Sequence, residues 1–130
     1  NNFYKLLRKG GLVYVTTPNF NSILRYRLKS EYNVISYPEH LSYFTPKTLN
    51  KVFNSGFKTK KITTTGFSFT RLKTSIGKSN QPIISIQSDD EKIRNLAESN
   101  KLVGALKIII NQLLTLFGVG DHLKGWFVKK

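Results

Sequence analysis

Residues 37–57 constrain the fold more than any other segment, because they contain a helix whose start is encoded locally. Thr45 is a favourable N-cap, and Pro46 suits the first helical position, where its missing N–H costs no hydrogen bond. Phe44 and Leu49 have the spacing of a hydrophobic staple, which fixes how the preceding loop enters the helix. The pattern therefore predicts a helix that begins at residue 46.

The same pattern predicts the buried face of this helix and its end. Leu49, Val52 and Phe53 fall on one side at helical spacing, and Gly56 is placed to stop the helix in the left-handed conformation. Just before the helix, a short loop carries two tyrosines, a glutamate and a histidine. Loops on a rigid scaffold often carry binding and catalytic residues, so this loop is the first candidate for chemistry.

Composition narrows the function classes. With 130 residues, 39% of them hydrophobic, the chain suffices for one compact domain over residues 1–130. The absence of cysteine excludes disulfides, thiolate zinc sites and cysteine catalysis.

The basic charge is concentrated in the first part of the chain. Residues 1–88 hold 14 Lys or Arg and two Glu, a net charge of +12 out of the total of +14. Such a field attracts phosphates, nucleic acid or anionic lipid headgroups, although a basic solvated surface is the ordinary alternative.

The first segments predict a helix, a strand and a loop. Residues 1–8 have helical spacing and run into a glycine pair, so we expect a C-terminal piece of a longer protein, cut inside that helix. Residues 12–15 are typical of a strand covered on both faces in a mostly parallel sheet. Since ligands bind beyond the carboxyl ends of such strands, Thr17, Asn19 and Asn21 are candidate site residues. Ordinary turn formation is the alternative explanation.

The later segments predict further helices and strands. Residues 22–29 favour a short helix in which Arg25 would belong to a basic lid. Residues 57–65 mix threonines and lysines, as an exposed edge strand does. The remaining expectations are a strand-like piece at 82–86, a helix from about 88 to 99, a helix over 102–117 and a terminal strand over 121–128.

The helix over 102–117 has an unusually wide apolar arc. Five aliphatic side chains share one face at helical spacing, namely Leu102, Leu106, Ile109, Leu113 and Leu116. Ile108 and Leu114 widen the arc beyond the need of a one-sided surface helix. This arc could be covered by two neighbouring elements, by a second chain or by a lipid surface. Lys107 and Asn111 exclude an uninterrupted membrane span.

Several of these segments together resemble a known family. Residues 7–12 have the form Leu-x-x-Gly-Gly-Leu, a strand closes on Thr-Pro-Asn, and residues 38–49 have the form Pro-Glu-His-Leu-x-x-Phe-Thr-Pro-x-Thr-Leu. A helix and Gly-Phe follow. This order is similar to the second half of class I S-adenosylmethionine-dependent methyltransferases, closest to the bacterial type 11, 12 and 23 groups. The resemblance covers residues 6–62, and residues 118–123 resemble the start of the family's last strand.

The resemblance implies the C-terminal part of a Rossmann-like α/β fold. We expect a small mixed three-stranded sheet in the family order 5-7-6, whose seventh strand is antiparallel, with residues 12–16 beside residues 122–128 and residues 57–64 outside them. Residues 66–120 would be a variable helical insertion. The exposed edge at 12–16 would invite self-association. The cofactor would be S-adenosylmethionine, bound mainly by elements upstream of residue 1. Thr17 is the one candidate contact within this sequence.

The resemblance also implies roles for side chains. His40 would act as the base that removes a proton from the acceptor, assisted by Glu39, and its ordinary pKa suits that task. Alternatively, both residues form hydrogen bonds with the loop backbone. Metal binding by Glu39 and His40 is a weaker alternative, because two ligands do not make a metal site. Tyr37 and Tyr43 would line the acceptor pocket. Asn19, Asn21 and Arg25 complete the expected substrate-binding set.

The resemblance leaves partners and location as expectations. The acceptor would be a small molecule, a sugar or a lipid-linked compound, and the piece alone is expected to be inactive. The alternative is a non-enzymatic basic module that binds nucleic acid or an anionic membrane surface. Nucleic acid is disfavoured because no helix is uniformly basic. Without a signal peptide we expect a cytoplasmic protein, with peripheral membrane contact through residues 101–118 as an option.

Overall fold

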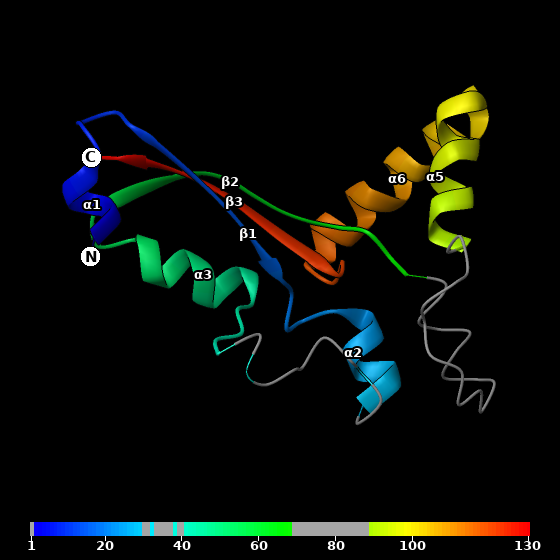
Figure 1. The fold of residues 1–130 in the computed structure, drawn as a ribbon, viewed down its shortest axis with the longest axis horizontal. Helices are drawn as coiled ribbons and strands as arrows, with labels where there is room; N and C mark the ends of the chain where they lie inside the picture. Colours follow the sequence, from blue (N-terminus) through cyan, green and yellow to red (C-terminus); the bar gives the residue numbers. More distant parts are fainter. Residues whose placement is uncertain (1, 30–31, 33–37, 39–40, 69–88) are drawn as a thin grey trace.

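The computed structural model describes residues 2–29, 32, 38, 41–68 and 89–130, in which helices lie along one face and at one end of a small sheet (Figure 1). The strand-like piece expected at 82–86 lies outside these residues. The elements along the chain are α1 (Asn2–Leu6), β1 (Leu12–Pro18), α2 (Ile23–Leu28), α3 (Pro46–Phe53), β2 (Phe57–Thr65), α5 (Asp89–Ser99), α6 (Lys101–Phe117) and β3 (His122–Lys129). The helices and strands predicted within the described residues are thus present.

The sheet has three strands in the order β1-β3-β2. β3 pairs antiparallel with β1, placing Tyr14 opposite Trp126, and antiparallel with β2, placing Lys61 opposite Trp126. The expected neighbours of β3 are confirmed, but the description of the sheet as mixed is wrong for these strands, because the central strand runs antiparallel to both of its neighbours. The edge position predicted for residues 57–65 is confirmed, and a register shift between Thr59 and Lys61 breaks the regularity of that edge.

One face of the sheet is covered by α3, which lies beneath the strands in Figure 1. The rings of Phe53 on α3 and Phe127 on β3 stack with centroids 4.2 Å apart. A second, smaller cluster joins Leu24 and Leu28 of α2 to Tyr32. The buried members of the main core are Val13, Leu49, Phe53, Phe57, Leu123 and Phe127.

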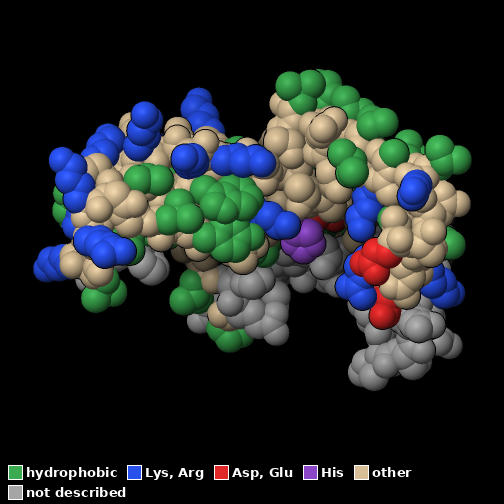
Figure 2. Space-filling model, turned by 90° about the horizontal axis from the view of Figure 1, so that it is seen from above, with side chains coloured by type: hydrophobic (Ala, Val, Ile, Leu, Met, Phe, Trp, Pro, Cys, Tyr) green, Lys and Arg blue, Asp and Glu red, His purple; other side chains and the backbone are tan. Residues whose placement is uncertain are grey.

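The opposite face of the sheet is open in the described structure. Leu12 and Tyr14 are 55% and 52% exposed, while Val13 between them is 8% exposed. This period-two alternation is that of a strand with one covered face, so the predicted coverage on both faces is wrong within the described residues. Figure 2 shows a hydrophobic patch on this side, bordered by Lys and Arg side chains. Tyr14 and Trp126 contribute to the open face, with ring centroids 5.0 Å apart.

The start of α3 confirms the local prediction. The Thr45 hydroxyl accepts a hydrogen bond from the Thr48 N–H, and the Thr48 hydroxyl accepts one from the Thr45 N–H, forming a capping box. Pro46 occupies the first turn. Phe44 packs against the core cluster that contains Leu49, as a hydrophobic staple requires.

The end of α3 differs from the prediction. The C-cap is Asn54 in the right-handed conformation, and Gly56 does not have the positive φ expected of a left-handed stop. Glycine is needed at position 56 for space, because a Cβ there would lie 2.7 Å from the Tyr4 ring. Val52 is 51% exposed, so its predicted burial is also wrong. The core needs only Leu49 and Phe53 from this helix.

The last two helices form an antiparallel pair beside the end of the sheet (Figure 1). α6 begins at the N-cap Asn100, whose side-chain oxygen accepts from the Leu102 N–H, and ends at Gly118 with φ of 68°. None of the described helices is both apolar enough and long enough to cross a bilayer.

Candidate functional site

The loop after β1 is held by the side chain of Asn19. Its amide nitrogen donates to the carbonyl oxygens of Gly118 at 2.9 Å and Gly120 at 2.7 Å, and its oxygen accepts from the Asn21 N–H at 3.0 Å. Asn19 is 0% exposed. Because its donors and its acceptor are engaged inside the protein, Asn19 positions the loop and offers no surface to a substrate in this conformation.

A buried pair, Ser22 and Asp121, ties the same loop to β3. The Ser22 hydroxyl donates to one carboxylate oxygen of Asp121 and accepts from the Leu24 N–H at 3.1 Å, which makes Ser22 the N-cap of α2. The other Asp121 oxygen accepts from the Ser68 N–H at 3.1 Å. This pair was not predicted from the sequence. A serine before an apolar helix was the available signal for half of it.

A cluster of rings and a cation, which we call the Arg25 cluster, lies on the outer side of this loop. It consists of Phe20, Asn21, Arg25, Tyr26 and Tyr43. The Arg25 Nε donates to the Phe20 carbonyl oxygen, and its Cζ lies 4.1 Å from the Phe20 ring centroid and 4.4 Å from that of Tyr26. The Tyr26 hydroxyl donates to the Asn21 side-chain oxygen at 2.9 Å. The guanidinium thus lies over two aromatic rings, a stabilising geometry for a cation.

Backbone pairing brings the loop before α3 to this cluster. The Phe20 N–H donates to the Phe44 carbonyl oxygen at 2.8 Å, and Asn19 and Phe44 form an isolated parallel bridge. As a result, the Tyr43 ring lies 5.7 Å from the Phe20 ring. Three predicted substrate residues, Asn21, Arg25 and Tyr43, therefore meet near the carboxyl end of β1 although they are scattered in the sequence.

The structure assigns no ligand-binding role to the other predicted site residues. Thr17 is half-buried in β1 and pairs with Leu123, and no described contact gives it a ligand-binding role. Tyr37, Glu39 and His40 lie outside the described residues, so their catalytic and binding roles stay predictions. Among the residues whose placement is described, no group of three or more His, Asp or Glu could hold a metal ion.

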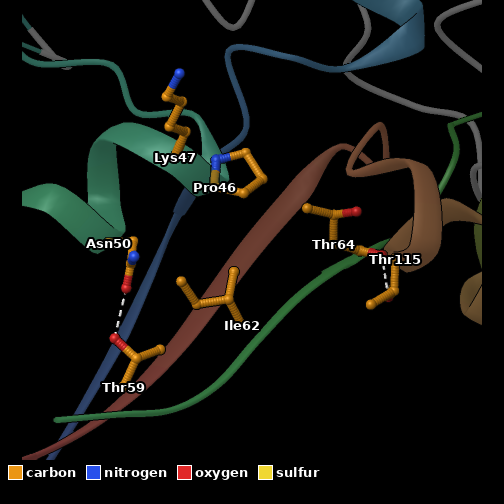
Figure 3. A pocket seen from close by; sticks show the side chains of 7 residues that line it. All are labelled: Pro46, Lys47, Asn50, Thr59, Ile62, Thr64 and Thr115. Carbon is orange, nitrogen blue, oxygen red and sulfur yellow. Dashed lines mark hydrogen bonds between the residues drawn. The ribbon is translucent and has the colours of Figure 1, made fainter.

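A pocket of about 380 Å³ lies between α3, β2 and α6, away from the Arg25 cluster. Figure 3 shows Ile62 and Thr59 of β2 below α3, with the Lys47 side chain pointing away from them. Two hydroxyl groups in the lining of the pocket already donate hydrogen bonds within the protein. Thr59 donates to the Asn50 side-chain oxygen at 2.5 Å, and Thr115 donates to the Thr64 carbonyl oxygen at 2.8 Å. The lining residues are Pro46, Lys47, Asn50, Thr59, Ile62, Thr64 and Thr115.

The pocket contains none of the predicted site residues, and its lining has no carboxylate or imidazole that could serve as a base. The Arg25 cluster offers a cation and aromatic faces, which recognise a planar or anionic group. It is therefore the better candidate for ligand binding. Comparison with known proteins found no match for this chain among family models, curated proteins or solved structures.

Proposed function

We propose that this chain is the acceptor-side part of an S-adenosylmethionine-dependent methyltransferase. The observation that carries the proposal is the meeting of Asn21, Arg25 and Tyr43 near the carboxyl end of β1. Ligands of open α/β sheets bind at this end of the strands. In the proposal, β1, β3 and β2 are strands five, seven and six of a larger Rossmann-like sheet, and the reversed direction of β3 is compatible with that numbering.

The Arg25 cluster would hold the acceptor. Arg25 would face a phosphate or carboxylate of a small-molecule, sugar or lipid-linked acceptor, and Tyr43 would pack against its apolar part. His40, with Glu39 beside it in the sequence, would remove the proton from an acceptor hydroxyl. Methyl transfer depends mainly on positioning, so these residues would act by orienting the acceptor and by accepting its proton.

The described residues do not by themselves fit the cofactor. A nucleoside needs an accessible acidic side chain for its ribose hydroxyls, and Asp121 near the end of β1 is 3% exposed and bonded to Ser22 and Ser68. The cofactor would instead be held by further elements. The open face of the sheet and the unpaired edge of β1 within the described structure are where such elements would pack.

Calorimetry with S-adenosylmethionine tests the assignment, using this chain and the longer methyltransferase to which the proposal assigns it. We expect binding by the longer protein and none by this chain. In the longer protein, Arg25→Ala should raise the KM for the acceptor while Arg27→Ala, an exposed neighbour on α2, should not. His40→Ala should lower kcat. Failure of both proteins to bind the cofactor would refute the assignment.

A second candidate function is binding of single-stranded nucleic acid on the open face of the sheet. Tyr14 and Trp126 form an aromatic pair there, and the Lys61 ammonium lies 5.7 Å from the Trp126 ring. Aromatic side chains with neighbouring cations are the usual platform for unpaired bases. Trp126 is the one tryptophan of the chain, so its fluorescence reports on this face directly.

This candidate predicts that a single-stranded oligonucleotide quenches Trp126 fluorescence and that the effect weakens steeply with salt. Tyr14→Ala should reduce the affinity, because it removes one of the two stacking rings. Tyr26→Ala is the matched control, since Tyr26 is similarly exposed but lies on α2. Unchanged fluorescence at low salt would exclude this function.

A further inference from the structure

α6 is attached to the body of the protein through its polar side. The Asn111 side-chain oxygen accepts from the Gly66 N–H at 2.9 Å, and the Thr115 hydroxyl donates to the Thr64 carbonyl oxygen at 2.8 Å. In return, the Thr64 hydroxyl donates to the Leu114 carbonyl oxygen at 2.6 Å. These bonds fix the rotation of α6 about its own axis.

This rotation directs the apolar side of α6 toward solvent. α6 has no buried residue, and Leu102 and Leu116 are 82% and 76% exposed. The arrangement is the reverse of an ordinary surface helix, whose apolar side faces the core. Figure 2 shows hydrophobic side chains along the margin of the half that contains α5 and α6. We call the exposed side chains of Leu102, Leu106, Ile109, Leu113, Leu116 and Phe117 the α6 stripe.

The charged side chains of α6 itself are both positive, while α5, which packs against α6, carries four acidic and two basic side chains. Lys101 and Lys107 lie on opposite borders of the stripe at helical spacing, and both are exposed. The sequence of α6 contains no Asp or Glu, and the whole chain has a net charge of +14. A second copy of the chain would bring like charges together, whereas an anionic surface would be attracted. The two lysines beside the stripe and the net charge of the whole chain therefore favour an anionic partner surface.

We propose that α6 lies on the surface of an anionic phospholipid bilayer. The α6 stripe would enter the boundary between headgroups and acyl chains, and Lys101 and Lys107 would contact lipid phosphates. A surface position also suits the length of α6. Its 17 residues extend about 25 Å, less than the roughly 30 Å of the hydrocarbon core. The proposal is independent of methyl transfer, since it uses no residue of the Arg25 cluster.

Vesicle flotation with the 130-residue chain tests the proposal, using phosphatidylglycerol–phosphatidylcholine vesicles beside pure phosphatidylcholine vesicles. We expect flotation with the anionic vesicles and much less with the neutral ones. The double variant Leu106→Gln/Leu113→Gln should partition at least about tenfold more weakly, because burying one leucine is worth on the order of tenfold or more. Glutamine keeps the helix propensity and adds no charge.

The matched control is Leu6→Gln/Leu41→Gln, which removes two leucines that are 82% and 78% exposed outside α6. Its flotation should equal that of the unmodified chain. The proposal is refuted if the unmodified chain does not float with anionic vesicles, or if both double variants lose flotation equally. A dimer in sedimentation that Leu106→Gln/Leu113→Gln abolishes, without flotation, would also refute it and assign the stripe to a second copy.

Discussion

Replacing Asn19 by alanine should destabilise the fold more than replacing its neighbour Asn21 in the loop after β1. Asn19 connects this loop to the turn between α6 and β3, through donors to Gly118 and Gly120 that are far away in the sequence. Alanine keeps the backbone conformation accessible and removes the carboxamide. The variant therefore tests whether these hydrogen bonds hold the two segments together.

The expected loss of stability is the sum over the backbone groups that lose their hydrogen bond to the Asn19 side chain. The Gly120 carbonyl is buried, and losing its donor costs about 1–3 kcal/mol. The Asn21 N–H loses its acceptor in a partly buried position, for about 1 kcal/mol. The Gly118 carbonyl keeps a donor from the Asn21 side chain at 3.2 Å, so its loss is smaller. We expect a total of about 3 kcal/mol, or roughly 10 °C in Tm.

Urea denaturation followed by circular dichroism measures this loss, with Asn21→Ala as the matched control. Asn21 also donates to Gly118, but over a longer distance and from a half-buried position. Its removal should cost about 0.5–1 kcal/mol. If the two variants lose the same stability, the hydrogen bonds of Asn19 do not hold the loop as we argue.

Asn19→Asp adds a test by charge. The aspartate would face the carbonyl oxygens of Gly118 and Gly120 in a buried site, which should raise its pKa in the folded state. A raised carboxyl pKa means that the folded state retains the proton longer than the unfolded state. Stability should then fall as the pH rises above the unfolded pKa of about 3.9. A variant whose stability relative to the unmodified chain is constant from pH 4 to 7 would contradict this reasoning.

Two further pairs of variants test the core and a close backbone approach. Phe127→Ala should cost about 3–5 kcal/mol in urea denaturation, because Phe127 is 0% exposed, while Phe117→Ala at 68% exposure should cost less than about 0.5 kcal/mol. Equal losses would contradict the assigned core. Gly120→Ala places a Cβ 2.6 Å from the Thr65 nitrogen and should cost at least about 2 kcal/mol. Gly10→Ala, with open space at φ of 76°, should cost only about 1 kcal/mol. A loss of stability in Gly10→Ala larger than that in Gly120→Ala would contradict this ranking.

Much of the fold within the described residues could be predicted from local patterns. Thr45 and Pro46 mark the start of α3 whatever surrounds it, because a cap satisfies the first backbone N–H groups by itself. The failures at Gly56 and Val52 have a tertiary cause. The Tyr4 ring, 52 positions earlier in the sequence, requires the small residue at 56, and the core accepts only part of the predicted stripe.

The candidate site was predicted in part. Asn21 follows a predicted strand, Arg25 and Tyr43 have the chemistry of ligand-binding side chains, and the structure brings the three to one surface. Asn19 has the same chemistry, but its side chain turns inward to two distant carbonyls. Such a distinction depends on contacts across about 100 residues, which no local pattern contains.

By itself, the sequence determined where most helices and strands of the described structure lie, because capping and periodicity act over a few neighbouring residues. It also determined that the helix over 102–117 has a wide apolar arc. Only the tertiary structure decided that this arc faces solvent, since the hydrogen bonds of Asn111 and Thr115 to the end of β2 set the rotation of the helix. The open sheet face was decided in the same way, by which side of the strands α3 covers.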